Sequence, residues 1–533
     1  MNMKKHLVSC RAAARGLLGA MLALPFFAST ARAQQQQPPN EATAAAAAAA
    51  QQQQQDAGLG LTPGTPVVGT LPGGFAPAYG LRPKEESEGG FQFDFHGLIT
   101  MPLRVGLNSR AGVVTTEQKN FVIHAPPVVP DYPDSPGYTA VVPQPYVQLA
   151  FSYGNPIVTG TAIIKAWTAT TANSFFDPTL QGGITDAFIT FNIPTLAKSA
   201  HISINVGAFS NRYGTMGEYD EGHYATPIIG RTNGVGENVI ARLALGDWVL
   251  AFEQGFQGQL DKTPIGLTSD GWNGFADPNT GTSLVMHEHL GVTYRRQLTL
   301  GLHHMLAWSQ DDRAAQAFTP DGSITVLGAD LRFSGSHIGH AYLGASYTIA
   351  NDARSVGRIL SVMNTQGGAD LMRNYLGPDS GGNGKILTIG AEYGVSLARL
   401  LLYPGDFDGK SRDIVLSAFG IYSRVASEDV KYNGDNKIRF GAEGSYTLAS
   451  WFAASGRVDH VRPTSNVDGR EFTILSPRLI FRTDWQARNQ IVLQYSRYIY
   501  GSNPIVRSGY PAVDDPKLKP DENMVSLSAS MWW

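Results

Sequence analysis

The sequence lacks several features on which common protein classes depend. Its only cysteine, Cys10, lies near the amino terminus, so the remaining chain has no intramolecular disulfide and no thiolate chemistry. Charged residues make up only 16% of the 533 residues, and the formal net charge is −3, which argues against a basic surface for nucleic acid. Beyond residue 33 there is no apolar run of about 18 residues, which excludes an ordinary transmembrane helix.

The first 33 residues have the layout of a secretory signal peptide. Lys4 and Lys5 give a positively charged start, residues 16–28 are apolar, and Ala31 to Ala33 form an A-x-A cleavage site. We therefore expect residues 1–33 to be a signal peptide that directs export.

Residues 34–90 are of low complexity. They contain glutamine at 34–37 and 51–55, alanine at 44–50, and then a proline- and glycine-rich stretch. Such a composition cannot bury an apolar core, so we expect a disordered tether. A short coiled coil and a plug inside a barrel are the alternatives.

From Phe91 to the end, the chain alternates apolar and polar residues with a period of two. In 91–107 most odd positions are apolar, whereas many of the even positions are polar. A strand with this period places one face against an apolar phase and the other against water. Nearly twenty such segments in a row, with no helix between them, favour a closed barrel with lipid outside and water inside. Odd positions of 91–107 and 523–533 should face lipid.

The predicted fold class is all-β, with residues 91–533 forming a single large antiparallel transmembrane β-barrel of 16 to 18 strands, 18 being favoured. We predict strands at 91–107, 145–153, 156–168, 183–193, 200–212, 234–245, 247–257, 284–296, 297–308, 324–335, 337–350, 385–398, 412–424, 436–448, 451–462, 471–484, 489–500 and 523–533.

The connections between these segments alternate in length. Long ones, such as 108–144 and 258–283, follow every odd-numbered strand, and short ones follow the even-numbered strands; the connection at 399–411 is long for its class. Bacterial barrels have short periplasmic turns and long extracellular loops. We therefore expect both ends of the barrel in the periplasm.

Tryptophan supports the same arrangement, because amphipathic rings collect at membrane interfaces. Seven of the eight tryptophans lie within two residues of an expected strand end: Trp167, Trp248, Trp308, Trp451, Trp485, Trp532 and Trp533.

The carboxy-terminal segment is amphipathic and ends on an aromatic residue. Apolar side chains occupy positions 525, 527, 529, 531 and 533. In this respect the chain resembles bacterial outer-membrane β-barrel proteins of the porin type. The resemblance implies an outer-membrane location in a Gram-negative bacterium and contact with its lipids and lipopolysaccharide. It also implies recognition of the last strand by the barrel assembly machinery, and it leaves the choice between monomer and homotrimer open.

One long connection carries an acidic cluster that could narrow a pore. Residues 213–233 include Glu218, Asp220 and Glu221. In general porins the third long loop folds inward. In an eighteen-strand ring the facing wall would present the bases Lys437, Arg439, Arg457, Arg478 and Arg482. An acidic loop opposite a basic wall gives a transverse field at a constriction. The alternative is a solvated surface loop with unrelated lumen charges.

The inward charges are otherwise mixed, so strong ion selectivity does not follow. We expect the acids Asp94, Glu253, Glu392, Glu443 and Asp459 to face inward together with the bases Arg104, Arg242, Arg295, Arg332, Arg439 and Arg457.

Catalytic signatures are weak throughout. The segment 405–411 departs from a P-loop, and there is no G-x-S-x-G. His287, His289 and His303 should face inward as polar lumen residues; a metal site at them is the alternative.

The sequence thus predicts a passive channel for ions and small hydrophilic solutes, without enzymatic activity, cofactor or bound metal. A barrel with a non-transport role, as an enzyme or adhesin, and a secreted soluble β-protein are the alternatives.

Removal of Trp533 should impair assembly more than it impairs the finished barrel. One ring is a small part of the lipid-facing area, yet it occupies the position that the resemblance assigns to recognition. We expect less folded protein in the outer membrane of expressing cells, measured by heat-modifiable migration. Unchanged levels would contradict the resemblance at this terminus.

Overall fold

The computed structural model describes residues 91–107, 146–155, 157–169, 179–193, 199–210, 231–260, 282–295, 297–310, 322–335, 338–353, 360–362, 365–366, 375–377, 379–402, 411–462, 464–469, 471–485, 489–502 and 521–532. The predicted signal peptide and low-complexity segment, 1–33 and 34–90, lie outside these residues.

Each of the eighteen predicted strands is present, with bounds that differ from prediction by only a few residues. They are β1 (Gln92–Gly106), β2 (Tyr146–Gly154), β3 (Val158–Ala169), β4 (Thr179–Ile193), β5 (Ala200–Ser210), β6 (Arg231–Leu245), β7 (Trp248–Leu260), β8 (Thr282–Tyr294), β9 (Leu298–Gln310), β10 (Ser323–Gly335), β11 (Gly339–Asn351), β14 (Gly384–Ser396), β15 (Asp413–Ser427), β16 (Asn436–Ala449), β17 (Phe452–Arg462), β18 (Phe472–Arg482), β19 (Gln490–Tyr500) and β20 (Asp521–Trp532).

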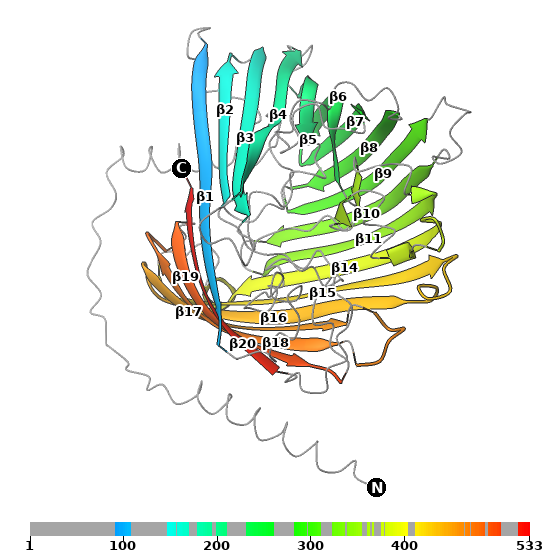
Figure 1. Cartoon of the computed structure of the whole chain (residues 1–533). Helices are drawn as coiled ribbons and strands as arrows, with labels where there is room; N and C mark the ends of the chain where they lie inside the picture. The colour runs from blue at the N-terminus through cyan, green and yellow to red at the C-terminus, as the bar shows by residue number, and fades with distance from the viewer. Residues whose placement is uncertain are drawn as a thin grey trace, which may run out of the picture. The chain divides into compact units, whose positions relative to one another are not determined.

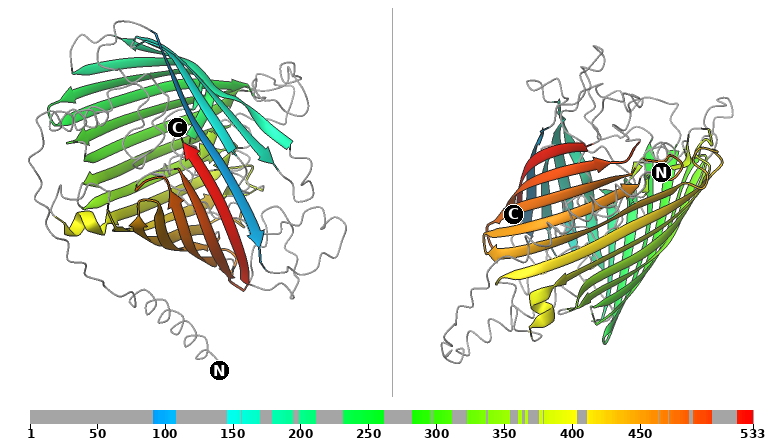
Figure 2. Two further views of the ribbon diagram at one scale, coloured as in Figure 1. Left: turned by 90° about the vertical axis from the view of Figure 1, so that its left-hand side faces the viewer. Right: turned by 90° about the horizontal axis from the view of Figure 1, so that it is seen from below.

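The strands form one closed antiparallel barrel (Figures 1 and 2). Each pairs with its neighbour in the chain, and β1 closes the ring by pairing with both β2 and β20. The register places Phe95 opposite Phe151 on one side, and Leu103 opposite Leu527 on the other. Closure joins the first strand to the last, so that the sheet can satisfy its backbone hydrogen bonds internally, as spanning lipid requires. No helix among the described residues is long and apolar enough to cross a membrane.

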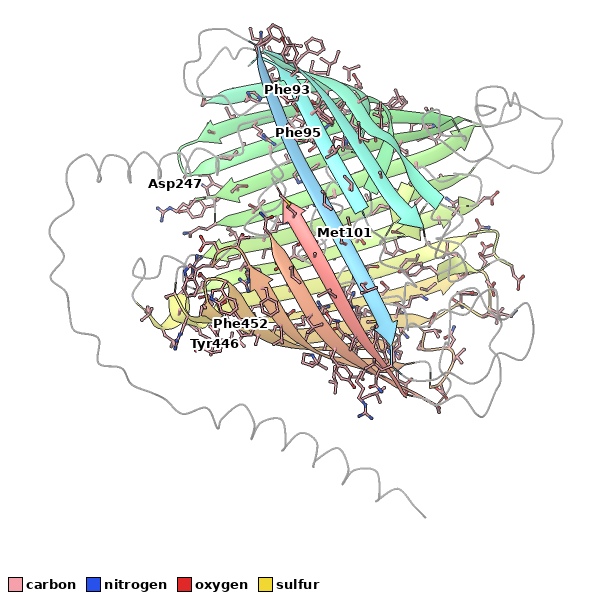
Figure 3. All side chains as sticks on the ribbon, turned by 60° about the vertical axis from the view of Figure 1, so that its left-hand side comes forward. Phe93, Phe95, Met101, Asp247, Tyr446 and Phe452 are labelled. Carbon is pink, nitrogen blue, oxygen red and sulfur yellow. The ribbon has the colours of Figure 1, made fainter. Side chains whose placement is uncertain are left out.

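The two faces of the barrel wall differ as the period of two predicts. Phe93 and Met101 on β1 are exposed outward (Figure 3). Leu103 on β1 is exposed on the same face, as are Leu527 and Met531 on β20. Along β11 the exposed outward residues alternate with buried inward ones. The chain is therefore a transmembrane β-barrel whose apolar side chains face outward.

The connections separate into two classes at the two ends of the barrel. Short turns join β2 to β3, β6 to β7, β8 to β9, β10 to β11 and β16 to β17. In the two-residue turn between β6 and β7, Gly246 adopts φ +60°, which a residue without a β-carbon adopts at no steric cost. β1 begins and β20 ends at this short-turn end, because Gln92 pairs with Gly154 and Trp532 pairs with Leu98.

The connection at 399–411 is long for its class, and its described residues, 399–402 and 411, contain no further strand. It begins with the five-residue helix α5 (Leu397–Leu401), which Ser396 caps by accepting a hydrogen bond from the Arg399 N–H at 3.1 Å. The next strand, β15, still pairs directly with β14.

Two short strands inside the long connection between β11 and β14 were not predicted. They are β12 (Leu360–Val362) and β13 (Thr365–Gln366), which pair with each other. Leu360 also pairs with Thr232 of β6. Since β6 lies five strands from β11 in the ring, this connection reaches well beyond its own neighbours.

Substitution of Leu527 by arginine should destabilise the barrel. Leu527 is 42% exposed on the outer face near the centre of β20, and a cation at the bilayer midplane costs about 2–4 kcal/mol. The free energy of unfolding in lipid vesicles, from a denaturant titration, measures this loss. Ser528→Arg on the inward face is the matched control, and an equal effect of the two would contradict the assigned faces.

Candidate functional site in the barrel lumen

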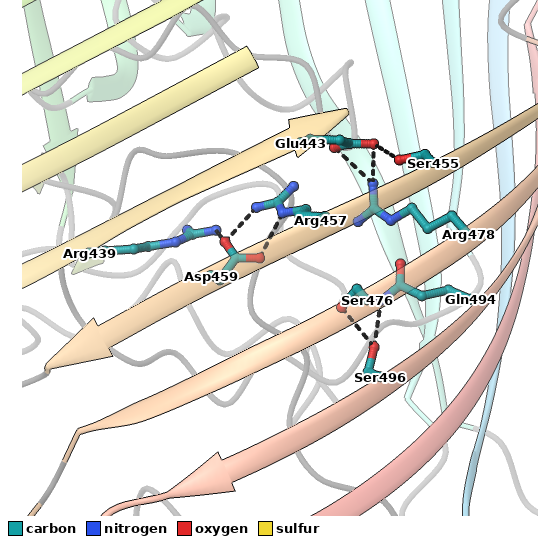
Figure 4. A network of polar contacts seen from close by, with 9 residues as sticks. All are labelled: Arg439, Glu443, Ser455, Arg457, Asp459, Ser476, Arg478, Gln494 and Ser496. Atoms are coloured by element: carbon teal, nitrogen blue, oxygen red, sulfur yellow. Dashed lines mark hydrogen bonds and ion pairs between the residues drawn. The ribbon is translucent and has the colours of Figure 1, made fainter. Parts of the chain in front are cut away.

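The inward face of β16, β17 and β18 carries a cluster of charged residues (Figure 4). We define the arginine cluster as Arg439, Glu443, Arg457, Asp459 and Arg478. Arg457 donates two hydrogen bonds to Asp459, at 2.7 and 2.8 Å, and Arg439 donates a third at 3.2 Å. Arg478 lies 3.4 Å from Glu443. Three cations thus share two carboxylates, and the cluster carries an excess of one positive charge.

The arginine cluster is held in place by neighbours on the same wall. Phe419 of β15 lies beneath the guanidinium groups of Arg439 and Arg457, at 5.4 and 5.0 Å from its ring centroid. Glu443 also accepts a hydrogen bond from Ser455. On β18 and β19, Ser476 and Gln494 bond to Ser496 at 3.2 and 2.7 Å (Figure 4). Stacking on the ring and the bidentate bonds to Asp459 orient Arg457.

The inward face of β6 to β10 carries a second polar cluster. We define the histidine cluster as Asn238, Glu253, His287, His289, His303, Asp330 and Arg332. His303 lies 2.6 Å from Asp330, which also accepts from Arg332 at 2.7 Å. Asn238 donates to Glu253 at 3.0 Å. Eight strands separate β7 from β18 in either direction around the ring, so the two clusters lie on opposing walls.

Glycines on β7, β8 and β9 leave room for the imidazole rings. A β-carbon at Gly301 would lie 2.2 Å from the Asp330 carboxylate and 2.8 Å from the His303 ring. At Gly255 it would lie 2.1 Å from His287. These glycines therefore allow large polar side chains to lie flat against the wall.

The predicted inward histidines are confirmed as lumen residues. The rings of His289 and His303 lie 4.8 Å apart, whereas His287 lies 3.3 Å from the side-chain oxygen of Asn238. Within the described parts of the chain, no group of three or more His, Cys, Asp or Glu side chains has the geometry to hold a metal ion.

The lumen becomes apolar toward the long-connection end. Inward side chains of six strands, including Val285, Met305, Val326, Ile386 and Val425, form a buried cluster with Tyr375 and Leu376. Those two residues belong to the connection between β11 and β14, so part of this connection packs inside the barrel.

Several bonds anchor the inward-packed segment. The Leu376 carbonyl accepts hydrogen bonds from Ser380, at 3.1 Å, and from Ser427. The Asp379 N–H donates to Asp429 at 3.2 Å. The Lys437 ammonium lies 4.9 Å from the centroid of the Tyr375 ring and 3.6 Å from Asp435. Lys437 therefore supports this segment.

Each base expected on the facing wall has an acidic or carbonyl neighbour. Lys437, Arg439, Arg457 and Arg478 lie on the inward face near acids, and Arg482 donates to the Trp485 carbonyl at 3.0 Å. The facing loop acids Glu218, Asp220 and Glu221 lie outside the described residues. Residues 231–233, expected in that loop, belong to β6.

Among the other expected inward charges, Glu253, Arg242 and Arg332 are buried, and Glu392 lies 3.7 Å from His340. The placement of Arg295 was wrong. It is exposed in the turn after β8 and donates to Asp247 at 2.9 Å, because β8 ends at Tyr294 and not at residue 296 as predicted. The side chains of Asp94 and Arg104 lie outside the described set.

Part of the predicted aromatic girdle is described. Trp248 and Trp451, at the short-turn end, are 48% and 57% exposed. Their rings lie 4.6 Å from Tyr294 and 5.5 Å from Phe452. Trp308, 6.0 Å from Phe256, lies toward the other end of β9, and Trp485 lies in the turn after β18. The side chains of Trp167 and Trp533 fall outside the described residues.

The sequence matches no protein-family model and no curated protein. Among solved structures, the chain is similar to OmpT of Vibrio cholerae, at 9% identity and a TM-score of 0.33, covering 84% of this chain and 99% of that one. It is also similar to OprD of Pseudomonas aeruginosa, at 8% identity and a TM-score of 0.35, covering 83% and 94%. It is similar as well to OpdK of Pseudomonas aeruginosa, at 9% identity and a TM-score of 0.35, covering 83% of this chain and 99% of that one.

These neighbours are outer-membrane proteins by name. The likeness is loose, and the assignment of the fold rests on the strand pairing described above.

Gly301→Ala should destabilise the barrel by about 1–3 kcal/mol, because the new β-carbon would press on Asp330 and His303 in a close-packed wall. Gly258→Ala on β7 is the matched control, since its β-carbon would meet only Leu284 at an ordinary 3.4 Å. Denaturant titrations in lipid vesicles measure both. Equal free energies of unfolding for the two variants would show that the side chains of the histidine cluster move aside for the new β-carbon without loss of stability.

Proposed function

We propose that this protein is an outer-membrane channel for passive diffusion of ions and small hydrophilic solutes. The observation that carries the proposal is the pair of charged clusters on opposing inward walls of a barrel whose outer face is apolar. Barrels of sixteen to eighteen strands are wide enough to leave an aqueous lumen. In this proposal solutes are selected by bore and by lumen charge.

The arginine cluster would supply the positive side of a transverse field. Its cations outnumber its carboxylates by one, and Arg439 and Arg457 are fixed by Asp459 and by the Phe419 ring. Salt screens exposed charges from ions that are more than about 8–10 Å away. Fixed charges in a narrow lumen are screened less, so they act on passing ions over longer distances. The loop acids Glu218, Asp220 and Glu221 would supply the negative side.

The remaining context belongs to the same proposal. Residues 1–33 would direct export, and residues 34–90 would form a disordered periplasmic tether. Both ends of the barrel would lie in the periplasm, with lipopolysaccharide around the long-connection end. The last strand would be recognised by the barrel assembly machinery.

A barrel enzyme or adhesin is the rival function. The described lumen offers histidine–carboxylate pairs such as His303 with Asp330, which resemble part of a hydrolase site. Conductance in a planar bilayer separates the two functions, because an adhesin or a closed enzyme would pass no steady ion current.

The triple variant R439Q, R457Q and R478Q should shift the reversal potential toward cation preference. It would leave Asp459 and Glu443 on a wall that has lost three positive charges, so the local excess would change from +1 to −2. The opposite triple variant, E218Q, D220N and E221Q, should shift the potential toward anions if the loop lies at the constriction. Both are measured in a salt gradient across a planar bilayer.

Arg424→Gln is the control, because Arg424 faces outward on β15 and is exposed. It should leave the reversal potential unchanged. Wild-type selectivity in the arginine triple variant, with the barrel still heat-modifiable, would remove this cluster from the ion path. Absence of conductance in the wild type would reject the channel itself.

A further inference from the structure

A row of polar side chains crosses the outer surface of the barrel at mid-height. Gln254, Glu288 and His304 are the central residues of the thirteen-residue strands β7, β8 and β9. Gln254 pairs with Glu288, and Glu288 with His304. We call these three residues the outer polar row.

The outward orientation of this row follows from its neighbours. Glu253, His287 and His303 are buried on the inward face, and the residues one position along point the other way. The His304 ring nitrogen lies 3.2 Å from Glu288, and these two side chains remain 31% and 39% exposed. Glu237, next to the centre of β6, is exposed on the same face.

The row is exceptional on the outer face. On the other strands, outward ionisable or amide side chains among those described lie within four residues of the long-connection end: Asn351, Lys385, Arg424, Asn436, His460, Arg462, Arg497 and Asn523. Those positions can reach headgroups and water. In the middle of the wall, the described outer residues of those strands are apolar, small or aromatic.

Polar groups at this height are costly against lipid. The apolar band of an outer-membrane barrel is about 25 Å tall, so a mid-height residue lies roughly 12 Å from either interface. Glutamate, glutamine and histidine are too short to extend that far, unlike lysine or arginine in snorkelling conformations. Ionisable residues inside membranes are normally covered by protein or water.

We propose that β6 to β9 form an interface with a second copy of this chain, and that the outer polar row lies at its centre. The row contains donors, in the Gln254 amide and the His304 ring, and acceptors, in Glu288 and Glu237. A surface that carries both hydrogen-bond donors and acceptors can form hydrogen bonds with the same surface of a second copy. Closed symmetric assemblies require such self-complementary surfaces.

The surroundings of the row fit the same partner. Phe252, Phe256, Leu290 and Leu302 flank it, each between 41% and 48% exposed. Aromatic and aliphatic side chains around a small polar centre are typical of protein interfaces. The inference concerns assembly and does not depend on the barrel conducting ions.

The decisive variant is the double substitution E288L and H304L in the full chain. We expect the wild type to be oligomeric in mild detergent by light scattering, and its dissociation constant to rise at least about tenfold in the variant. The barrel itself should remain folded by heat-modifiable migration, because leucine is compatible with lipid, whereas the substitution removes the polar groups that the proposed interface pairs.

The double substitution H460L and T473L is the matched control. His460 and Thr473 form another outward hydrogen-bonded pair, at 3.0 Å, but near the long-connection rim. This control should keep the wild-type oligomer. A wild type that is monomeric, or an oligomer that survives E288L and H304L, would overturn the proposal and leave the row facing lipid or water.

Cross-linking in membranes identifies the occupant. The only natural cysteine, Cys10, lies in the expected signal peptide, so Leu290→Cys introduces a single thiol in the mature chain. A flexible bismaleimide should join two copies at this position, and Leu343→Cys on the outer face of β11 should not. A product whose mass is not a multiple of the chain would reject the second copy in favour of another protein.

Discussion

The constraint on which the structure depends is the need to pair every backbone N–H and C=O in a medium that offers no hydrogen bonds. The pairing of β1 with β20 meets it, because it turns an open sheet with two edges into a ring. Once the ring is closed, each strand must place alternate side chains outward and inward. The separation of an outer face from an inner face, and the placing of successive connections at alternate ends of the barrel, follow from that geometry.

Closure of the ring also brings the charged inward side chains together in the lumen. The inward faces of β16 to β18 carry Arg439, Arg457 and Arg478 with two carboxylates between them. On the opposite wall, histidines lie over glycines that have no β-carbon to block them. The two walls differ in chemistry: one carries permanent guanidinium charges held on an aromatic ring, and the other carries imidazole and carboxylate groups.

Two features depart from the simple pattern of apolar outside and polar inside, and both point to contacts beyond the wall. Inward apolar residues such as Ile386 and Val425 pack with Tyr375 and Leu376 of a connection that enters the barrel. Outward polar residues at mid-height, Glu288 and His304, mark a surface that lipid alone would cover poorly. The inward apolar residues have their partner in that connection, and for the outward polar residues we proposed a second copy of the chain.

The sequence by itself predicted 16 to 18 strands, with 18 favoured, together with their order and the face of most residues, because a side-chain period of two is a local property. It also identified the basic residues of β16 to β18, since an inward position follows from that period. It did not predict the pairing of Arg457 with Asp459 or the inward packing of Tyr375. Those depend on cross-strand register and on a contact between segments far apart in the chain. Consecutive apolar residues, such as Ile386 with Leu387 and Val326 with Leu327, were a local signal of that packing. Only the closed ring decided which walls face each other. The strand that lies opposite a given strand depends on the number of strands in the ring, which no single segment sets.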